Sequence, residues 1–459
     1  MRPAAWWSGW FCAWALVGCG GGGSSTAAPS SSDVAPPASC DAPTVKRWVN
    51  DYLGSWYYWN HDLAAAPDVN GTDTVASYFG QRLYDGRNSA APYKDRWSYL
   101  GTTADFDQYF TEGRTLGYGL SVAGRMDDPL PVRVRYVAPG SAAEAAGLRR
   151  GMVIDALNGQ PASSFRNAGF TPLAPAQAGD TVNLRVLDAP GAASSRELTL
   201  TASVYALTPV GATTVVTSAG GRKLGYMLFT TFISQARTPL NDAFAQLKSQ
   251  GVTEMVLDLR YNGGGLVSTS RDLASAIVGP AYVGQRYTRL KFNAEHAAQD
   301  NDYLFNQSLT ALGVKRVYVL SGPRTCSASE LVINGLKGLD GLEVVQVGST
   351  TCGKPFGFQP RDNGCGQTFS VVNFASVNAK DAGAYVDGLA PSCVVADDFD
   401  HALGNADEGL LAEARAYADR GSCSAAAATG KALGAKASRA GPAGAWTRDG
   451  DERQGLTDR

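Results

Sequence analysis

The stretch "KRVYVLSGPRTCSASELVINGL", residues 315–336, decides the fold. The β-branched and aromatic residues of "VYVL" predict a buried strand, and the apolar residues that follow Ser327 predict a helix. A further apolar run, "LEVVQVG" (342–348), predicts a second strand after that helix. A strand, a helix and a strand in this order predict an α/β layer with parallel strands.

The same alternation begins earlier, so residues 222–400 form one predicted unit. In this type of sheet, functional side chains lie in the loops at the carboxyl ends of the strands. The glycine turn "YNGGG" (261–265) follows one of these strands directly. In chain order the expected elements are a strand over 224–232, a helix over 238–250, a buried strand over 254–260 and a helix over 266–279.

The residues "SASE" (327–330) allow two interpretations. The pattern S-x-x-E is that of a capping box, in which the serine caps a helix and the glutamate reaches back to it. A serine at a helix N-terminus is also well placed to be a nucleophile, because helix N–H groups favour developing negative charge. The glycine turn 261–265 can present a backbone N–H to the same charge, or it is only a loop.

A base for this serine is not obvious in a chain with only three histidines. Lys354 lies in "TTCGKPFG" (350–357), a turn of small residues after a strand, where burial would lower its pKa and make it a neutral base. A solvated surface lysine is the alternative interpretation. A Ser-His-Asp triad that uses His401 is the rival mechanism, whereas His61 and His296 lie in no motif.

Residues 113–207 change to short strands and glycine turns. The segments "LGYGLSV" (116–122) and "VAPGSAAEAAGLRRGMVIDALNG" (137–159) resemble a PDZ domain of the bacterial protease type. Such a domain receives a peptide carboxyl terminus on loop N–H groups while the peptide adds a strand to a sheet edge. Without that resemblance, the glycines would be a tight turn. The implied carboxylate-binding loop is Gly117, Tyr118, Gly119 and Leu120.

Three segments together resemble the carboxyl-terminal processing (tail-specific) proteases of peptidase family S41: "VLDLRYNGGGLV" (256–267), "TCSASELVINGL" (325–336) and "GSTTCGKPFG" (348–357). The resemblance covers about residues 45–420. It implies a ClpP/crotonase-like α/β protease core with a β-rich PDZ domain inserted and a helical N-terminal region. The implied catalytic residues are Ser327 as nucleophile and Lys354 as base, with the backbone N–H groups of Ala328 and Gly264 as oxyanion hole.

The chain departs from that family pattern in three places. The segment "GLKGLDGLE" (335–343) widens the spacing between Ser327 and Lys354. A glutamine that often follows the lysine by four residues is replaced by Phe358, so Gln359 is the candidate partner of the lysine. Cysteines flank both catalytic candidates, and a bridge between Cys326 and Cys352 would stiffen the site.

The N-terminus predicts export. Residues 1–18 read as a signal peptide, and Leu16-Val17-Gly18-Cys19 resembles a bacterial lipobox, which implies acylation of Cys19. An ordinary secretory signal is the alternative. Residues 19–39 are rich in Gly, Ser and Pro and predict a flexible linker. Gly20 after the cysteine favours an outer-membrane lipoprotein that faces the periplasm.

The six cysteines that follow the lipobox predict disulfides in an exported chain, with fifteen possible connectivities. Proximity in sequence favours Cys352 with Cys365 and Cys393 with Cys423. Cys40 and Cys326 would then form a long-range pair or remain free thiols. No CxxC or HxxxH spacing occurs, so no metal site is expected.

The predicted domains are a helical N-terminal region (40–112), a PDZ domain (113–207), a protease core (208–423) and a disordered tail (424–459). In the helical region four aromatic residues recur at helical spacing, which indicates core packing rather than a carbohydrate platform. They are Trp48, Tyr52, Trp56 and Trp59.

The expected function is that of a cell-envelope serine endopeptidase that cleaves unfolded or C-terminally tagged proteins. A net charge of −2 argues against a nucleic-acid partner, and no phosphate-binding or nicotinamide motif predicts a cofactor. Membrane contact is expected only through the lipid on Cys19. The alternatives are a non-catalytic ligand-binding or peptide-binding envelope protein on the same scaffold, and a scaffold that uses only its PDZ groove.

Overall fold

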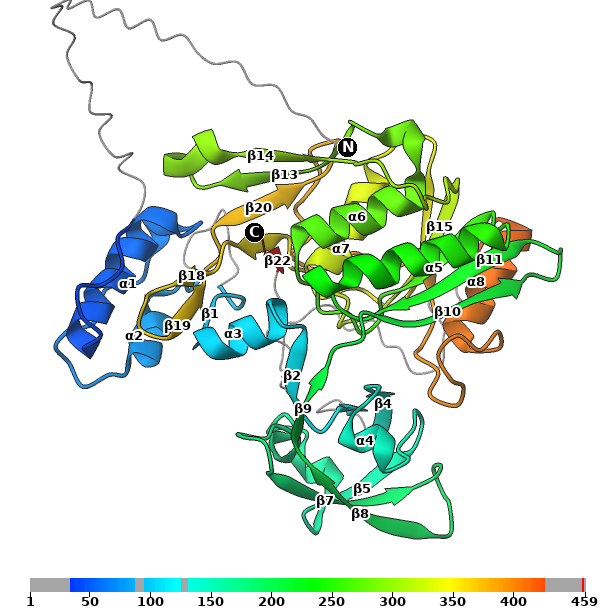
Figure 1. Cartoon of the computed structure of the whole chain (residues 1–459), viewed down its shortest axis with the longest axis horizontal. Helices are drawn as coiled ribbons and strands as arrows, with labels where there is room; N and C mark the ends of the chain where they lie inside the picture. The colour runs from blue at the N-terminus through cyan, green and yellow to red at the C-terminus, as the bar shows by residue number, and fades with distance from the viewer. Residues whose placement is uncertain (1–33, 87–94, 125–130, 426–455, 458–459) are drawn as a thin grey trace, which may run out of the picture.

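The computed structural model describes residues 34–86, 95–124, 131–425 and 456–457, and Figure 1 shows their arrangement. A six-stranded sheet of order β10-β11-β12-β15-β16-β21 lies at its centre. All neighbouring strands in it are parallel except β10, which pairs with β11 in the antiparallel sense, so the predicted α/β layer is confirmed. The strands are β10 (Val210–Thr217), β11 (Lys223–Phe229), β12 (Glu254–Asp258), β15 (Arg316–Ser321), β16 (Glu343–Gly348) and β21 (Cys393–Val394).

Alternation of side chains along the strands divides the core into two layers. Met255 and Leu257 of β12 pack in the cluster that contains the apolar faces of α5, α6 and α7. Val256, between them, packs in the cluster that contains α8 on the other face. The helices are α5 (Arg237–Ser249), α6 (Val267–Val278), α7 (Ala328–Lys337) and α8 (Gly409–Arg420).

A second sheet, of order β14-β13-β20-β17-β22, lies beside the first. Its strand β17 begins two residues after Lys354, so this sheet adjoins the predicted site. The sequence predicts a disordered tail, but its residues 456–457 form the two-residue strand β22, which pairs in parallel with β17. The strands are β13 (Arg286–Phe292), β14 (Asn301–Leu304), β17 (Phe356–Phe358), β20 (Phe374–Val377) and β22 (Leu456–Thr457).

The N-terminal region packs through aromatic side chains. Trp48 stacks on Tyr52 and meets Phe369 edge-on, with ring centroids 5.1 Å apart in both pairs. The expectation that the aromatic residues pack as a core therefore holds, and their partners include Phe356 and Phe358 of β17. The elements are α1 (Ala42–Trp56), α2 (Val75–Arg82), α3 (Thr103–Phe110), and a sheet of β1 (Tyr99–Thr102), β19 (Gln367–Ser370) and β18 (Arg361–Asp362).

Residues 113–124 and 131–207 form a β-rich domain with a core of its own. Its first strand β2 (Arg114–Gly117) pairs with its last strand β9 (Ser203–Ala206), and these two strands join the domain to the rest of the molecule (Figure 1). The chain thus leaves and re-enters the main body at one place. The domain also contains β3 (Leu120–Ala123), β4 (Arg133–Val137), α4 (Ala142–Ala145), β5 (Val153–Leu157), β6 (Gln160–Pro161), β7 (Thr181–Leu187) and β8 (Ser195–Thr201).

The disulfide pattern is partly as predicted. Cys393 pairs with Cys423, as expected. The predicted bridge between Cys352 and Cys365 is wrong, because Cys352 pairs with Cys326 and Cys365 pairs with Cys40. Parallel pairing of β15 with β16 brings the loops after both strands together, and these loops hold Cys326 and Cys352. Contact along the sheet, rather than proximity in sequence, determines this pair.

Within the described ranges, no helix is both long and apolar enough to cross a membrane. The predicted signal peptide 1–18 and the lipidation site Cys19 lie outside those residues.

Candidate active site

Ser327 lies in the loop between β15 and α7, at the carboxyl end of a central strand. Its backbone has φ 58° and ψ −112°, a conformation that costs free energy for any residue with a Cβ. The side chain is fully buried, and Oγ has no hydrogen-bond partner among the described residues. A buried hydroxyl without a partner is costly and uncommon, so this oxygen is a candidate for chemistry.

Glu330 supplies half of the predicted capping box. Its Oε2 accepts a hydrogen bond from the Ser327 N–H at 2.9 Å. The reciprocal hydrogen bond of a capping box, from the Glu330 N–H to Ser327 Oγ, is absent among the described residues. The same carboxylate accepts hydrogen bonds from the Gly353 and Lys354 N–H groups, both at 2.8 Å, and from Thr351 Oγ1 at 2.5 Å. Glu330 therefore joins the loop of Ser327 to the loop of Lys354. Its complete burial raises the pKa of its carboxyl group, and these donors oppose that rise.

Lys354 is buried, with 4% of its surface exposed. Burial lowers the pKa of its ammonium group to about 7, although the charges of Asp95 and Glu330 act in the opposite direction. Its Nζ lies 4.2 Å from the centre of the Phe358 ring. Lys354 is therefore not a solvated surface charge, and a large share of it is neutral near pH 7.

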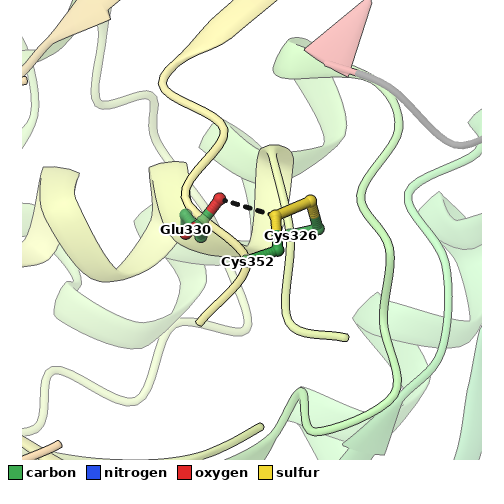
Figure 2. Close-up of side chains that lie close together, drawn as sticks. All are labelled: Cys326, Glu330 and Cys352. Carbon is green, nitrogen blue, oxygen red and sulfur yellow. Dashed lines mark hydrogen bonds between the residues drawn. A yellow bond between two sulfur atoms is a disulfide. The ribbon is translucent and has the colours of Figure 1, made fainter. Parts of the chain in front are cut away.

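A disulfide bond joins the two loops directly (Figure 2). Cys326 precedes Ser327, Cys352 stands two residues before Lys354, and their Cα atoms are 5.2 Å apart. The segment 335–343 that widens the spacing lies at the other end of α7, about 15 Å along the helix from Ser327. The additional residues therefore leave the approach of the two loops intact.

The glycine turn after β12 packs against Ser327. The Asn262 carbonyl accepts hydrogen bonds from the Cys326 N–H at 3.1 Å and from Ser329 Oγ at 2.9 Å. Gly264 has φ 115°, and a Cβ there would lie 2.9 Å from the Ser327 Cβ, closer than side chains pack. Only glycine fits this position.

The two predicted oxyanion donors differ in their hydrogen bonding. Ala328 is the first residue of α7, so its N–H has no acceptor within the helix. The Gly264 N–H donates to Asn262 Oδ1 at 2.9 Å. The predicted donor at Gly264 is therefore engaged by its own loop in this structure.

In the described part of the chain, neither Gln359 nor His401 forms a hydrogen bond with Ser327 or Lys354. The Gln359 N–H donates to Asn373 Oδ1 at 3.1 Å, and the aromatic ring of Phe358 covers Lys354 instead. His401 is 43% exposed at its side chain and pairs with Asp398 at 2.7 Å. Neither the glutamine partner nor the triad is supported by these contacts.

The predicted carboxylate-binding loop borders a cavity of about 260 Å³ between the β-rich domain and the N-terminal region. Gly117, Tyr118, Gly119 and Leu120 all line the cavity, and Tyr118 also packs in the core of the β-rich domain. Gly119 has φ 73°, and a Cβ there would overlap Ser141. The opposite wall includes Phe106 and Tyr109 of α3.

The sequence analysis missed a buried ionic network behind the glycine turn. Arg260 is 2% exposed and pairs with Asp258 at 2.9 Å and with Glu408 at 2.5 Å. It also contacts Asp397 at 3.1 Å, and Arg150 of the β-rich domain contacts that same carboxylate at 2.7 Å. Two charged residues at the end of the apolar strand "VLDLR" were the available signal, because charges at such positions must be paired.

Two protein-family models match parts of the chain. The model "Peptidase family S41" matches residues 223–395, and the model "Peptidase S41 N-terminal domain" matches residues 44–99. These two segments are therefore similar to peptidases of family S41. The segment 223–395 contains Ser327, Glu330 and Lys354.

The curated relatives of this chain are named as processing peptidases. It is 32% identical over 253 residues to the chloroplastic C-terminal processing peptidase of Tetradesmus obliquus, covering 53% of this chain and 52% of that protein. It is 30% identical over 247 residues to the carboxyl-terminal-processing protease of a Picosynechococcus strain, covering 53% and 55%. The chain thus matches about half the length of these relatives.

A solved structure shares the fold of this chain. The crystal structure of a Bacteroides fragilis protein assigned to the S41 proteases superposes with a TM-score of 0.64 at 23% identity. The match covers 82% of this chain and 97% of that one. At this identity the likeness describes the fold alone.

Proposed function

We propose that the protein is a serine endopeptidase in which Ser327 is the nucleophile and Lys354 the general base. One observation carries the proposal. Ser327 Oγ is buried without a hydrogen-bond partner in the described part of the chain, and the backbone N–H groups of Ser327 and Lys354 both donate to the Glu330 carboxylate. Burial lowers the pKa of that lysine to about 7. A neutral buried lysine can activate a serine without histidine.

The proposed reaction has two stages. Neutral Lys354 takes the proton of Ser327 Oγ as this oxygen bonds to the substrate carbonyl carbon, and the ammonium group then gives the proton to the leaving amine as the C–N bond breaks. Water attacks the acyl-enzyme with Lys354 again as base, which releases the acid and restores Ser327. No metal or cofactor is needed for these steps.

The oxyanion is proposed to bind at the N-terminus of α7. The Ala328 N–H is the first donor, and the positive end of the helix dipole favours the same charge. The Gly264 N–H is the second donor in this proposal, in which it exchanges Asn262 Oδ1 for the oxyanion when substrate binds.

The substrate is proposed to be an extended, unfolded protein segment. The β-rich domain is proposed to act as a PDZ domain, with the N–H groups of residues 117–120 receiving a peptide carboxyl terminus. The cavity along this loop supports that role. At the site itself, the edge of β17 pairs with residues 456–457 of the chain's own tail, so an extended segment fits beside Lys354.

The proposed location is the bacterial cell envelope, with a lipid anchor on Cys19. Disulfide bonds form in oxidising compartments, and the described residues contain Cys40–Cys365, Cys326–Cys352 and Cys393–Cys423. These three disulfide bonds support the proposal that the protein is exported.

Hydrolysis of an unfolded protein tests the proposed activity. The full-length chain is incubated with reduced, alkylated casein, and new amino termini are counted beside the variants Ser327→Ala and Lys354→Met. Each variant is expected to lose activity by about a thousandfold or more, as removal of a nucleophile or its base does in other hydrolases. Equal cleavage by all three proteins would refute the dyad, and no cleavage by the parent chain would favour a binding protein on this scaffold.

A further inference from the structure

The Cys326–Cys352 disulfide differs from the other two in its position. It links the residue before the proposed nucleophile to a residue two positions before the proposed base. Both cysteines are half-buried, so a small dithiol can reach the bond. Figure 2 shows it beside the Glu330 carboxylate, with Cys352 Sγ 3.3 Å from Oε2.

The two loops have few other connections beyond the ends of their strands. The β15 and β16 ladder ends where Ser321 pairs with Gly348. Just past this point, the Ser349 N–H donates to the Ser321 carbonyl and Ser321 Oγ donates to the Ser349 carbonyl, both at 3.0 Å. Further along the described loops, the connections are a hydrogen bond from the Cys352 N–H to the Thr325 carbonyl at 3.1 Å and the hydrogen bonds to Glu330. The disulfide is thus the only covalent connection between these loops in the described chain.

We propose that the Cys326–Cys352 disulfide positions Lys354 against Ser327, so that the peptidase is active when this bond is formed and is switched off by a dithiol reductant. In that step the S–S bond takes two electrons and two protons from the dithiol, which becomes a disulfide, and leaves two cysteine thiols. This inference rests on the proposed function of the same site.

Reduction disturbs the site in two ways. The new Cys352 thiol is a donor 3.3 Å from Glu330 Oε2, the atom that already accepts from the Ser327 and Lys354 N–H groups. A third donor on this oxygen competes with both. The released loop also admits water to Lys354, and water favours the charged lysine, which is not a base.

A matched pair of double variants tests the inference in the full-length chain. Cys326→Ser with Cys352→Ser removes the bond at the site, and Cys393→Ser with Cys423→Ser removes a bond away from it. The bonds span 26 and 30 residues, so their loss should alter the unfolded chain similarly. Thermal unfolding of both variants checks this equivalence.

The expected result is a selective loss of turnover. For the Cys326/Cys352 variant, kcat on casein should fall by about tenfold or more with KM little changed, and the pH profile of kcat should move to higher pH. The Cys393/Cys423 variant should keep the parent activity. The parent and the Cys393/Cys423 variant should lose activity with dithiothreitol and regain it on oxidation, in step with the Cys326–Cys352 bond measured by thiol labelling and peptide mapping.

Two outcomes would overturn the inference: an unchanged kcat and pH profile in the Cys326/Cys352 variant, or loss of activity in the parent that follows another disulfide instead. If the Cys326/Cys352 variant does not fold, the inference is tested by the parent alone, from whether its activity returns in step with the Cys326–Cys352 bond during reoxidation. An inactive oxidised parent would instead contradict the proposed function, so the two failures are distinguishable.

Discussion

At the scale of single residues, the site holds two side chains in states that folding alone disfavours. Ser327 has a positive φ and a buried hydroxyl with no partner within the described ranges, and Lys354 is an amine buried against the Phe358 ring. Each state costs stability, and each is useful to a nucleophile and its base. The cost at Lys354 can be measured without any substrate.

Replacing Lys354 with methionine should stabilise the fold in a pH-dependent way. Burial lowers the lysine pKa to about 7 from its ordinary 10.5, so between these values the unfolded chain binds more protons than the folded one. The stability of the parent therefore rises with pH across this window. Lys354→Met removes the penalty, so its gain in unfolding free energy should be largest below about pH 7 and shrink towards pH 10.

Urea unfolding at about pH 6 and about pH 9 measures this difference. The exposed Lys291 provides the control, because Lys291→Met should show no such dependence. A gain from Lys354→Met that is the same at both pH values would mean that the buried amine is not the origin of the penalty.

At the scale of elements, the unit β15, α7 and β16 assembles the site around Glu330. Glu330→Gln replaces one acceptor oxygen with a donor amide that faces N–H groups. We expect a loss of about 1–3 kcal/mol of stability and a fall in kcat, because buried polar groups lose their partners. Calorimetry and casein hydrolysis measure the two effects.

Glu144 is the matched control, since Ser141 to Glu144 repeats the S-x-x-E pattern at α4. Its Oε2 accepts from the Gly140 N–H at 2.7 Å, and Ser141 Oγ accepts from the Glu144 N–H at 3.3 Å. Glu144→Gln should leave kcat unchanged. An equal fall in kcat for both variants would contradict a special role of Glu330.

The comparison of these two motifs shows what sequence could predict. The strands, helices and the position of Ser327 at a helix start followed from local patterns. In one motif the serine caps its helix, whereas in the other its Oγ has no partner. Around Ser327 the glycine turn at Gly264 packs against the serine itself, and the loop of Lys354 is bonded to its neighbours Cys326 and Glu330. Local sequence does not contain those contacts, and the same holds for the Cys326–Cys352 pair.

At the scale of the whole molecule, the β-rich domain contacts the loop that supports the site. Arg150 donates to Asp397 at 2.7 Å and to the Tyr261 hydroxyl at 2.5 Å, and Asp397 also pairs with Arg260. Arg260 precedes the Asn262 turn by two residues. The network therefore connects the proposed peptide-binding domain to the proposed oxyanion hole.

Removing Arg150 should weaken this connection. Arg150→Ala leaves Asp397 with one fewer cation, and we expect a loss of about 1–3 kcal/mol of stability and a several-fold fall in kcat on casein. The neighbouring Arg149 is exposed and 3.5 Å from Asp188, so Arg149→Ala should change neither quantity appreciably. If both variants behave like the parent, the contact between the domains does not support catalysis.

The most direct test of the account is covalent labelling of Ser327 by a fluorophosphonate, followed by intact mass and peptide mapping across a pH series. The account predicts one adduct, on Ser327, with a labelling rate that rises with pH through about 7 as Lys354 loses its proton. Lys354→Met should slow labelling by about a hundredfold or more. An adduct on another serine, or the same rate and pH dependence in Lys354→Met, would contradict the Ser327/Lys354 dyad.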